Sequence, residues 1–275
     1  MKQENDNCPI ISVLMSVFNN EKTIGASIES ILSQTFRDFE LIICDDGSSD
    51  NSSSIIKEYC KKDSRIVFIQ NPHNMGLSFS LNKCIEASKS FFCARMDGDD
   101  LCDENRLKIE YEFLTNHPEY AFVSTSMKKF DEKGFYSVPS SREPYSPTID
   151  DCVKGSPFCH ASILIRKNAY ERVGGYRDLK KTKGVEDYDL WLRLYAVGLY
   201  GCIIRQPLYS MYDGRDANHR RTFKRRLNEA WVRHDGYKRL RINIFKRIYV
   251  LKPIIIGLIP KCLYARFKKR HSSKA

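Results

Sequence analysis

The sequence predicts an α/β fold built on a single Rossmann-like, doubly wound mixed sheet. Four apolar runs are too short and too continuous for amphipathic helices and are rich in β-branched residues, as buried strands are: 10–16, 41–44, 66–69 and 91–94. Helical patterns separate these runs, and acidic residues directly follow two of them. This alternation is typical of a sheet covered by helices on both faces, which binds ligands at the carboxyl ends of its strands.

Helices are predicted where apolar residues recur every three or four positions. Two stretches show this spacing: Ile24, Ile28, Ile31 and Leu32, and then Leu77, Leu81 and Ile85. Further along, the runs 162–165 and 202–204 indicate strands, and a Gly pair at 174–175 ends a helix. Another helix is expected to begin near Glu186, where three acids lie at the positive end of its dipole.

Charge divides the chain into two parts. Residues 215–275 hold 19 Lys and Arg against 3 Asp and Glu, a net charge of +16, whereas residues 1–214 hold 26 against 31, a net charge of −5. We therefore expect a main α/β domain over 1–214 and a basic, partly amphipathic helical extension over 215–275. Such an extension can meet nucleic acid, anionic lipid or an acidic partner.

The composition indicates a globular protein with reduced thiols. Hydrophobic residues make up 42% and aromatic residues 12% of the chain, which excludes a disordered protein. The opening residues, MKQENDNCPI, are polar and unlike a secretion signal, and the ten cysteines include no C-x-x-C pair. We therefore expect a cytoplasmic location.

Acidic residues gather where two predicted strands end. Asp45 and Asp46 follow the second run, and Asp97, Asp99 and Asp100 follow the fourth. Carboxylates this close repel one another and raise each other's pKa, so we expect a cation or a set of hydrogen-bond donors among them. The alternative is a turn followed by a helix cap. It explains Asp50 and Asp103, each of which could cap the helix that follows, better than it explains Asp97 and Asp99.

Five motifs in order resemble a family 2 glycosyltransferase: SVLMSVFNNEKTIGASIESILSQTFRDFELIICDDGSSDNS, NMGLSFSLNKCIEAS, ARMDGDD, HASILIRKNAYERVGGY and VEDYDLWLRL. The resemblance covers residues 10–212 and is to the bacterial enzymes that build lipopolysaccharide, lipooligosaccharide and capsule chains. It implies a single GT-A domain, a nucleotide-sugar donor that is most often a UDP-sugar, a divalent metal, and inversion at the anomeric carbon.

The resemblance implies a donor site at the ends of the first two strands. Phe18 takes the position of an aromatic residue that stacks on uracil, with Ser16 and Asn19 beside it. Asp46 resembles the acid that accepts the uracil N3–H, and Asp45 accompanies it. A carboxylate there discriminates among bases because a wrong base leaves it without a hydrogen-bond donor.

Asp97 and Asp99 match the D-x-D motif of the family. The resemblance implies that the second acid binds the metal and that the first contacts the ribose or the metal. Hard oxygen ligands suit Mn²⁺ or Mg²⁺, which would neutralise charge on the departing nucleotide diphosphate and relieve the repulsion among the acids. Arg215 lies where relatives often carry an arginine that closes over the diphosphate.

Asp187 matches the base in the family's E-D pair, which takes the proton of the attacking acceptor hydroxyl. Glu186 and Trp191 are expected on the acceptor side, although Trp191 suits the core nearly as well. His160 either lines the active site or serves as a hydrogen-bonded structural histidine. Loop 130–158 is expected to shape the pocket for the donor sugar.

The basic extension places Lys or Arg every few positions among apolar residues. Its longest uncharged run, Pro253–Pro260, has eight residues, whereas a membrane-spanning helix needs about 20. We therefore expect an interfacial segment that holds the protein on the anionic inner face of a bacterial cytoplasmic membrane. The alternative is a helical cap packed on the main domain.

Two other classes of protein account for part of the pattern. A sugar nucleotidyltransferase would also use a nucleotide, a metal and carboxylates, but it would want a Gly-rich phosphate loop where this chain reads SVFNNEKT. A nucleic-acid-binding protein would explain the basic extension but not the acidic strand ends. A glycosyltransferase acting on a growing surface glycan or lipid-linked acceptor explains both, so we expect no nucleic-acid partner.

Overall fold

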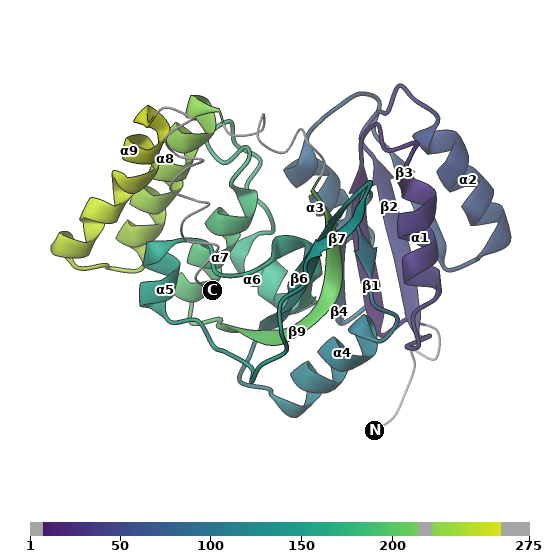
Figure 1. Ribbon diagram of the computed structural model, residues 1–275, viewed down its shortest axis with the longest axis horizontal. Helices are drawn as coiled ribbons and strands as arrows, with labels where there is room; N and C mark the ends of the chain where they lie inside the picture. Colours follow the sequence, from purple (N-terminus) through teal and green to yellow (C-terminus); the bar gives the residue numbers. More distant parts are fainter. Residues whose placement is uncertain (1–7, 214–221, 260–275) are drawn as a thin grey trace.

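A computed structural model describes residues 8–213 and 222–259 as a layered α/β structure (Figure 1). The strands are β1 (Ile11–Val17), β2 (Phe39–Asp45), β3 (Ile66–Gln70), β4 (Phe92–Asp97), β5 (Leu101–Cys102), β6 (Phe122–Asp131), β7 (Gly134–Ser137), β8 (Ile163–Arg166) and β9 (Gly201–Tyr212). The α-helices are α1 (Ile24–Leu32), α2 (Ser52–Lys62), α3 (Leu77–Ala87), α4 (Arg106–Asn116), α5 (Ile149–Lys154), α6 (Lys167–Val173), α7 (Glu186–Ala196), α8 (Phe223–Arg239) and α9 (Lys252–Leu258). Two 3-10 helices complete the set, η1 (His160–Ser162) and η3 (Ile244–Val250).

The strands form one mixed sheet in the order β3-β2-β1-β4-β8-β6-β9-β5, with β7 paired to β6. Strands β1 to β4 run parallel, whereas β8 is antiparallel to both β4 and β6. Ser16 near the end of β1 is in register with Cys44 of β2 and with Asp97 of β4. The two acidic strand ends therefore meet at the same edge of the sheet, on either side of β1.

Helices cover both faces of this sheet (Figure 1). Along β1, Leu14 faces a core that includes residues of α3, α6 and α7, whereas Val13 and Met15 face a core that includes residues of α1, α2 and α4. This alternation is the period of a strand buried on both faces. The doubly wound mixed sheet predicted from the sequence is confirmed.

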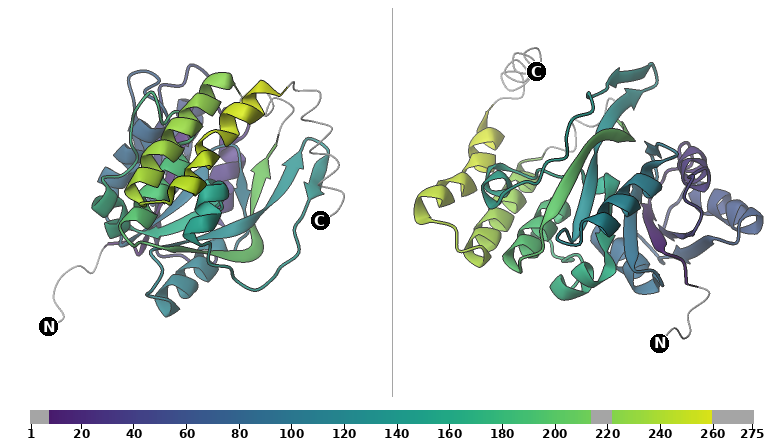
Figure 2. Two further views of the ribbon diagram at one scale, coloured as in Figure 1. Left: turned by 90° about the vertical axis from the view of Figure 1, so that its left-hand side faces the viewer. Right: turned by 90° about the horizontal axis from the view of Figure 1, so that it is seen from below.

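The helices of the C-terminal extension pack on α7. Helix α8 lies against α7, and η3 and α9 lie against α8 (Figure 2). Val232 and Tyr237 of α8 are fully buried in the same core as α7. A Cβ on Gly236 would come within 2.5 Å of the Leu192 side chain, which shows how closely the two helices approach. Helix α8 is therefore a packed cap, the alternative that the sequence left open.

The described part of the chain ends within this extension. Arg215 and the boundary predicted at residue 214 fall in 214–221, outside the described residues, and so does the basic segment from residue 260 onward. Within 8–213 and 222–259, none of the helices combines the length and the apolar character needed to cross a membrane.

Candidate active site

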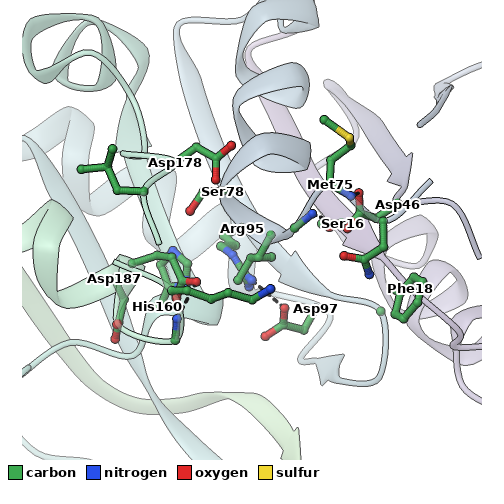
Figure 3. A pocket seen from close by; sticks show the side chains of 18 of the residues that line it. Ser16, Phe18, Asp46, Met75, Ser78, Arg95, Asp97, His160, Asp178 and Asp187 are labelled. Carbon is green, nitrogen blue, oxygen red and sulfur yellow. Dashed lines mark hydrogen bonds and ion pairs between the residues drawn. The ribbon is translucent and has the colours of Figure 1, made fainter. Parts of the chain in front are cut away.

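A cavity of about 850 Å³ opens at the carboxyl ends of β1, β2 and β4. Figure 3 shows Phe18 and Asp46 on one side of it, Asp187 and His160 on the opposite side, and Asp97 between them. Residues from the start of α3, the start of α7 and α8 complete the wall. Segments far apart in the sequence thus converge on one site.

The loop after β1 presents an aromatic ring to this cavity. The side chain of Phe18 is 44% exposed although the strand before it is buried. Asn19 adopts a positive φ of 54°, and its Oδ1 accepts a hydrogen bond from the Ser49 amide at 2.9 Å. This tether fixes the turn that leaves the Phe18 ring accessible for stacking. Ser16 lines the cavity. Contact of Ser16 and Asn19 with a donor stays a prediction.

Asp46 joins the end of β2 to the entry of α3. Its carboxylate accepts hydrogen bonds from the amides of Met75 and Gly76 at 2.9 and 2.8 Å and from the Asn71 side chain at 2.8 Å. Asp46 lines the cavity while it orders the loop that forms the neighbouring wall.

The prediction that Asp45 contacts the donor is wrong. Its side chain is fully buried. The carboxylate accepts hydrogen bonds from the Ser48 amide at 3.0 Å and from the Ser53 hydroxyl, so its hydrogen-bonding capacity serves the loop between β2 and α2.

Arg95 lies beneath the D-x-D motif. Its Nη2 donates to Asp97 Oδ1 at 2.6 Å, while its Nε and Nη1 have no hydrogen-bond partner among the described residues. Burial disfavours the charge, but the Asp97 carboxylate outweighs it and raises the pKa of Arg95. A buried cation at this position orients the first acid of the motif.

The acids of the D-x-D motif form a cluster suited to a cation. One carboxylate oxygen from each of Asp97, Asp99 and Asp100 lies within 4.8 Å of the others. Asp97 and Asp99 line the cavity, whereas Asp100 accepts hydrogen bonds from the Tyr209 hydroxyl at 2.8 Å and the Tyr212 amide at 2.7 Å. Burial, and then the charges of Asp97 and Asp99, raise the pKa of Asp100 to about 8. The cluster therefore has the hard oxygen ligands that Mn²⁺ and Mg²⁺ prefer, with Asp100 anchored to β9.

Asp187 and Glu186 face the same cavity from the first turn of α7. Glu186 Oε1 accepts a hydrogen bond from the Gly184 amide at 2.7 Å, and Asp187 Oδ2 accepts a longer one from Ser156 Oγ at 3.4 Å. Burial raises the pKa of both carboxyls, and the charge of Arg225 on α8 opposes that shift. A raised pKa brings a carboxylate nearer to the proton affinity that general-base catalysis requires.

His160 combines the two roles left open by the sequence. It lines the cavity, and its Nε2 lies 2.7 Å from the Tyr176 hydroxyl, which lies 3.0 Å from the Tyr170 hydroxyl. Burial, and then the charge of Arg95, lower the pKa of His160 well below its ordinary value. The imidazole is therefore neutral and held in place by the two tyrosines.

Comparison with known proteins agrees with this geometry. The family model described as Glycosyl transferase family 2 matches residues 12–174, more than half of the chain. The chain belongs to this family. It is 39% identical over 266 residues to EpsE, a protein of Bacillus subtilis (strain 168) named as a glycosyltransferase, with 95% of this chain and 94% of EpsE covered. It is 31% identical to the Escherichia coli glucosyltransferase WfaP, covering 69% of this chain and 72% of WfaP.

Solved structures share the fold of this family 2 glycosyltransferase. Residues 1–349 of Staphylococcus aureus TarS in complex with UDP-GlcNAc align with a TM-score of 0.68 and 17% identity, covering 89% of this chain and 79% of TarS. The mannosyltransferase PcManGT from Pyrobaculum calidifontis, in complex with GDP-Man and Mn²⁺, aligns with a TM-score of 0.63 and 14% identity, covering 97% of this chain and 81% of PcManGT. The GT-A fold predicted by resemblance is confirmed, and family membership favours a glycosyltransferase over a nucleotidyltransferase.

In this glycosyltransferase, Trp191 is a core residue, and its prediction as an acceptor-facing wall is wrong. Its side chain is fully buried, with its ring stacked on Phe122 at 4.9 Å between centroids and meeting the edge of Phe158 at 5.4 Å. Trp191 lies one helical turn beyond Asp187, and that turn carries it away from the mouth of the cavity into the layer between α7 and β6.

Sequence reasoning missed Arg95, the segments 74–78 and 178–184, and Arg225, all of which line the site in this glycosyltransferase. Arg95 belongs to the motif ARMDGDD. A cation within a predicted buried strand, two residues before Asp97, was the signal that could have identified it. Residues 74–78, which enter α3, line the cavity, as does Arg225 of α8. Nothing in the spacing of Arg225 sets it apart from the many other cations of the extension.

Proposed function

We propose that the chain is an inverting, metal-dependent glycosyltransferase that moves a sugar from a UDP-sugar to a hydroxyl of a growing surface glycan or lipid-linked saccharide. The observation that carries this proposal is that one cavity is lined both by the D-x-D acids Asp97 and Asp99 and by Asp187. The name of the relative WfaP describes transfer from UDP-Glc to GlcNAc-diphosphoundecaprenol, and the structural neighbour TarS was solved with UDP-GlcNAc.

The donor half of the site comprises Phe18, Ser16, Asp46 and the D-x-D acids. Phe18 offers an exposed ring face for the uracil. Asp46, which is 2% exposed, lines the cavity on the same side and would meet the edge of that base. Asp97 and Asp99 would hold Mn²⁺ or Mg²⁺, which supplies positive charge to the diphosphate leaving group when bound. The Asp97 oxygen paired with Arg95 is fixed before any ligand binds.

The acceptor half comprises Asp187, Glu186 and His160. As the acceptor oxygen forms its bond to the anomeric carbon, the bond from that carbon to the diphosphate oxygen breaks, and the hydroxyl proton passes to the Asp187 carboxylate. Attack from the face opposite the leaving group inverts the configuration. Glu186 and neutral His160 line the wall where the acceptor sugar would lie.

Release of UDP tests the donor and the chemistry together. The purified protein is incubated with a panel of UDP-sugars and GDP-sugars in Mn²⁺, in Mg²⁺ and in EDTA, with water as the fallback acceptor. UDP release from one UDP-sugar that stops in EDTA supports the proposal. GDP release without any UDP release would overturn the UDP assignment, and release that persists in EDTA would overturn the metal assignment.

We also propose that the extension holds the enzyme on the inner face of a bacterial cytoplasmic membrane. The support is an exposed apolar face on η3: Ile244 is 73%, Phe245 is 84% and Ile248 is 68% exposed. Lys246 and Arg247 lie among these residues. Apolar side chains flanked by cations suit an anionic lipid surface, where hydrophobic insertion and electrostatic attraction add.

A further inference from the structure

A second cavity, of about 830 Å³, lies where β6 and β9 separate. Thr125 pairs with Ile204, but the next residue of β6 in register, Met127, pairs with Tyr209. Residues 205–208 of β9 therefore bulge away from β6. The segment after β7 crosses the resulting hollow and is attached to β9 by hydrogen bonds from the Arg142 amide to the Arg205 carbonyl at 3.2 Å and between the backbones of Tyr145 and Ile203.

The second cavity adjoins the acceptor half of the active site. Segment 156–160 forms a wall shared by the two. Ser156 donates to Asp187 and His160 lines the active site, whereas Pro157 and Cys159 line the second cavity. The second cavity therefore lies next to the wall from which Asp187 and His160 face the active site.

The wall of the second cavity is basic. Arg142 and Arg205 both line it, and none of the described residues that line it is Asp or Glu. The guanidinium of Arg205 lies over the Tyr145 ring, 4.7 Å from the centroid, and within the described part of the chain it forms no ion pair. Serine hydroxyls and proline and valine side chains supply the hydrogen-bonding and apolar contacts that a sugar ring needs.

We propose that the second cavity binds an acidic sugar of the acceptor glycan, with Arg142 and Arg205 pairing its carboxylate or phosphate. The proposal rests on the proposed function, because it names the class of acceptor that this glycosyltransferase extends.

Binding of defined saccharides to the full-length protein, in the absence of donor, tests the proposal. Isothermal titration calorimetry compares a hyaluronan tetrasaccharide, which carries carboxylates, with maltotetraose 6-phosphate, which carries a phosphate, and with neutral maltotetraose. We expect wild type to bind at least one acidic probe more tightly than the neutral one. The preferred acidic probe identifies which anion the cavity takes.

Two variants locate the binding. Arg142→Gln and Arg205→Gln should each weaken binding of the preferred acidic probe by about fivefold or more, because each removes a charged hydrogen-bonding group. Arg37→Gln, which alters an exposed arginine in the loop before β2, is the matched control and should bind as wild type does.

UDP binding in Mn²⁺, measured on the same samples, separates this proposal from the proposed function. Loss of UDP binding in wild type would count against the proposed function alone. The cavity assignment is overturned if wild type binds neither acidic probe better than maltotetraose, or if the arginine variants bind the acidic probes as wild type does. Arg142 is exposed, so its variant remains informative even if Arg205→Gln fails to fold.

Discussion

The guanidinium of Arg95 and the carboxylate of Asp97 form an ion pair at 2.6 Å whose partners differ in exposure. The arginine side chain is 2% exposed and the aspartate side chain is 34% exposed. A buried cation thus holds one oxygen of a carboxylate whose remaining surface faces the donor cavity. The orientation of this acid is set by the protein before a nucleotide arrives.

Arg95→Met should lower kcat/KM for transfer by at least about tenfold, because Asp97 loses the group that orients it. The thermal midpoint should move little, since a buried guanidinium with two unpaired nitrogens recovers only part of its desolvation cost. Mn²⁺ titration of UDP binding checks the change, and Arg95→Lys should restore part of the affinity. A wild-type Mn²⁺ titration in Arg95→Met would show that Arg95 does not position the acid.

Asp99→Ala should abolish transfer and Mn²⁺-dependent UDP binding, because it removes a carboxylate oxygen from the cluster that would hold the metal. Asp97→Ala should be nearly as damaging. Calorimetric titration of UDP with and without Mn²⁺ measures the loss. Glu86→Ala, at an exposed acid on α3, is the control and should match wild type. Wild-type turnover by Asp99→Ala at limiting Mn²⁺ would refute the metal assignment.

Asp187→Asn should leave UDP-sugar binding unchanged while transfer falls about 10²- to 10⁴-fold, the usual cost of losing a general base. Donor affinity and single-turnover rate are measured on the same preparation. Asp178→Asn, which alters another acid of the same cavity, should retain most of the transfer rate. Loss of donor affinity together with rate would instead make Asp187 a donor-site residue.

The pH dependence of transfer should reflect the titration of Asp187. Burial raises the pKa of Asp187 above its ordinary value of 3.8. Transfer should therefore fall as pH decreases through that raised value, because the protonated acid cannot accept a proton. The free energy of unfolding should show the opposite trend. Because the folded protein binds the Asp187 proton more tightly than the unfolded chain does, protonation of Asp187 stabilises the fold at low pH. This stabilisation is lost as pH rises through the pKa of Asp187 in the folded state. Asp187→Asn should thus gain stability over wild type toward higher pH, as thermal unfolding across pH would measure.

Trp191→Phe should retain wild-type KM for the acceptor. The ring is fully buried against Phe122, and its Nε1 has no hydrogen-bond partner to lose. The smaller ring should lower stability by about 1 kcal/mol through lost packing. Steady-state kinetics with a soluble acceptor and thermal unfolding test both parts. A large rise in acceptor KM at an unchanged thermal midpoint would mean that Trp191 contacts the sugar after all.

Phe245→Glu combined with Ile248→Glu should weaken co-sedimentation with phosphatidylglycerol vesicles, because it places negative charge on the exposed apolar face of η3. The double variant should fold and release UDP as wild type does. Phe91→Glu, at a residue that is 81% exposed elsewhere in the fold, is the matched control. Substitution is a sharper test than truncation near residue 240, because truncation would also remove Ile242, which belongs to the core. Equal pelleting of all three proteins would remove the membrane assignment.

The sequence predicted the half of the fold in which strand and helix alternate regularly. The runs 10–16, 41–44, 66–69 and 91–94 became β1 to β4. Strands β1, β2 and β4 are largely buried, which keeps their runs apolar, whereas the edge strand β3 is only partly buried. Strands β6 and β7 were not predicted. The second half of β6 is only partly buried and β7 is exposed, so neither carries the continuous apolar signal of the central strands.

The candidate site was predictable where a residue type has few other uses. Clustered carboxylates at strand ends, such as those of Asp46 and Asp99, lower the stability of the fold unless a ligand or a set of hydrogen-bond donors compensates their charge. Such clusters can be recognised in the sequence. Trp191 and Asp45 were assigned wrongly because the direction of a side chain depends on packing that no short motif records. Arg225 reaches the cavity only because α8 docks on α7, a tertiary event with no local signature.

The pairing of β9 with the D-x-D loop has a consequence for the order in which the enzyme matures. The Tyr209 hydroxyl accepts the amide proton of Asp97 and donates to Asp100, across separations of 112 and 109 residues. Because a chain is synthesised from its amino terminus, the cluster of acids is translated long before the tyrosine that holds it. A ribosome-bound chain halted after residue 174, where the family match ends, would contain all of these acids. It would lack both Tyr209, which bonds to them, and Asp187. The hydrogen bonds of Tyr209 to Asp97 and Asp100 thus form only after β9 has been translated.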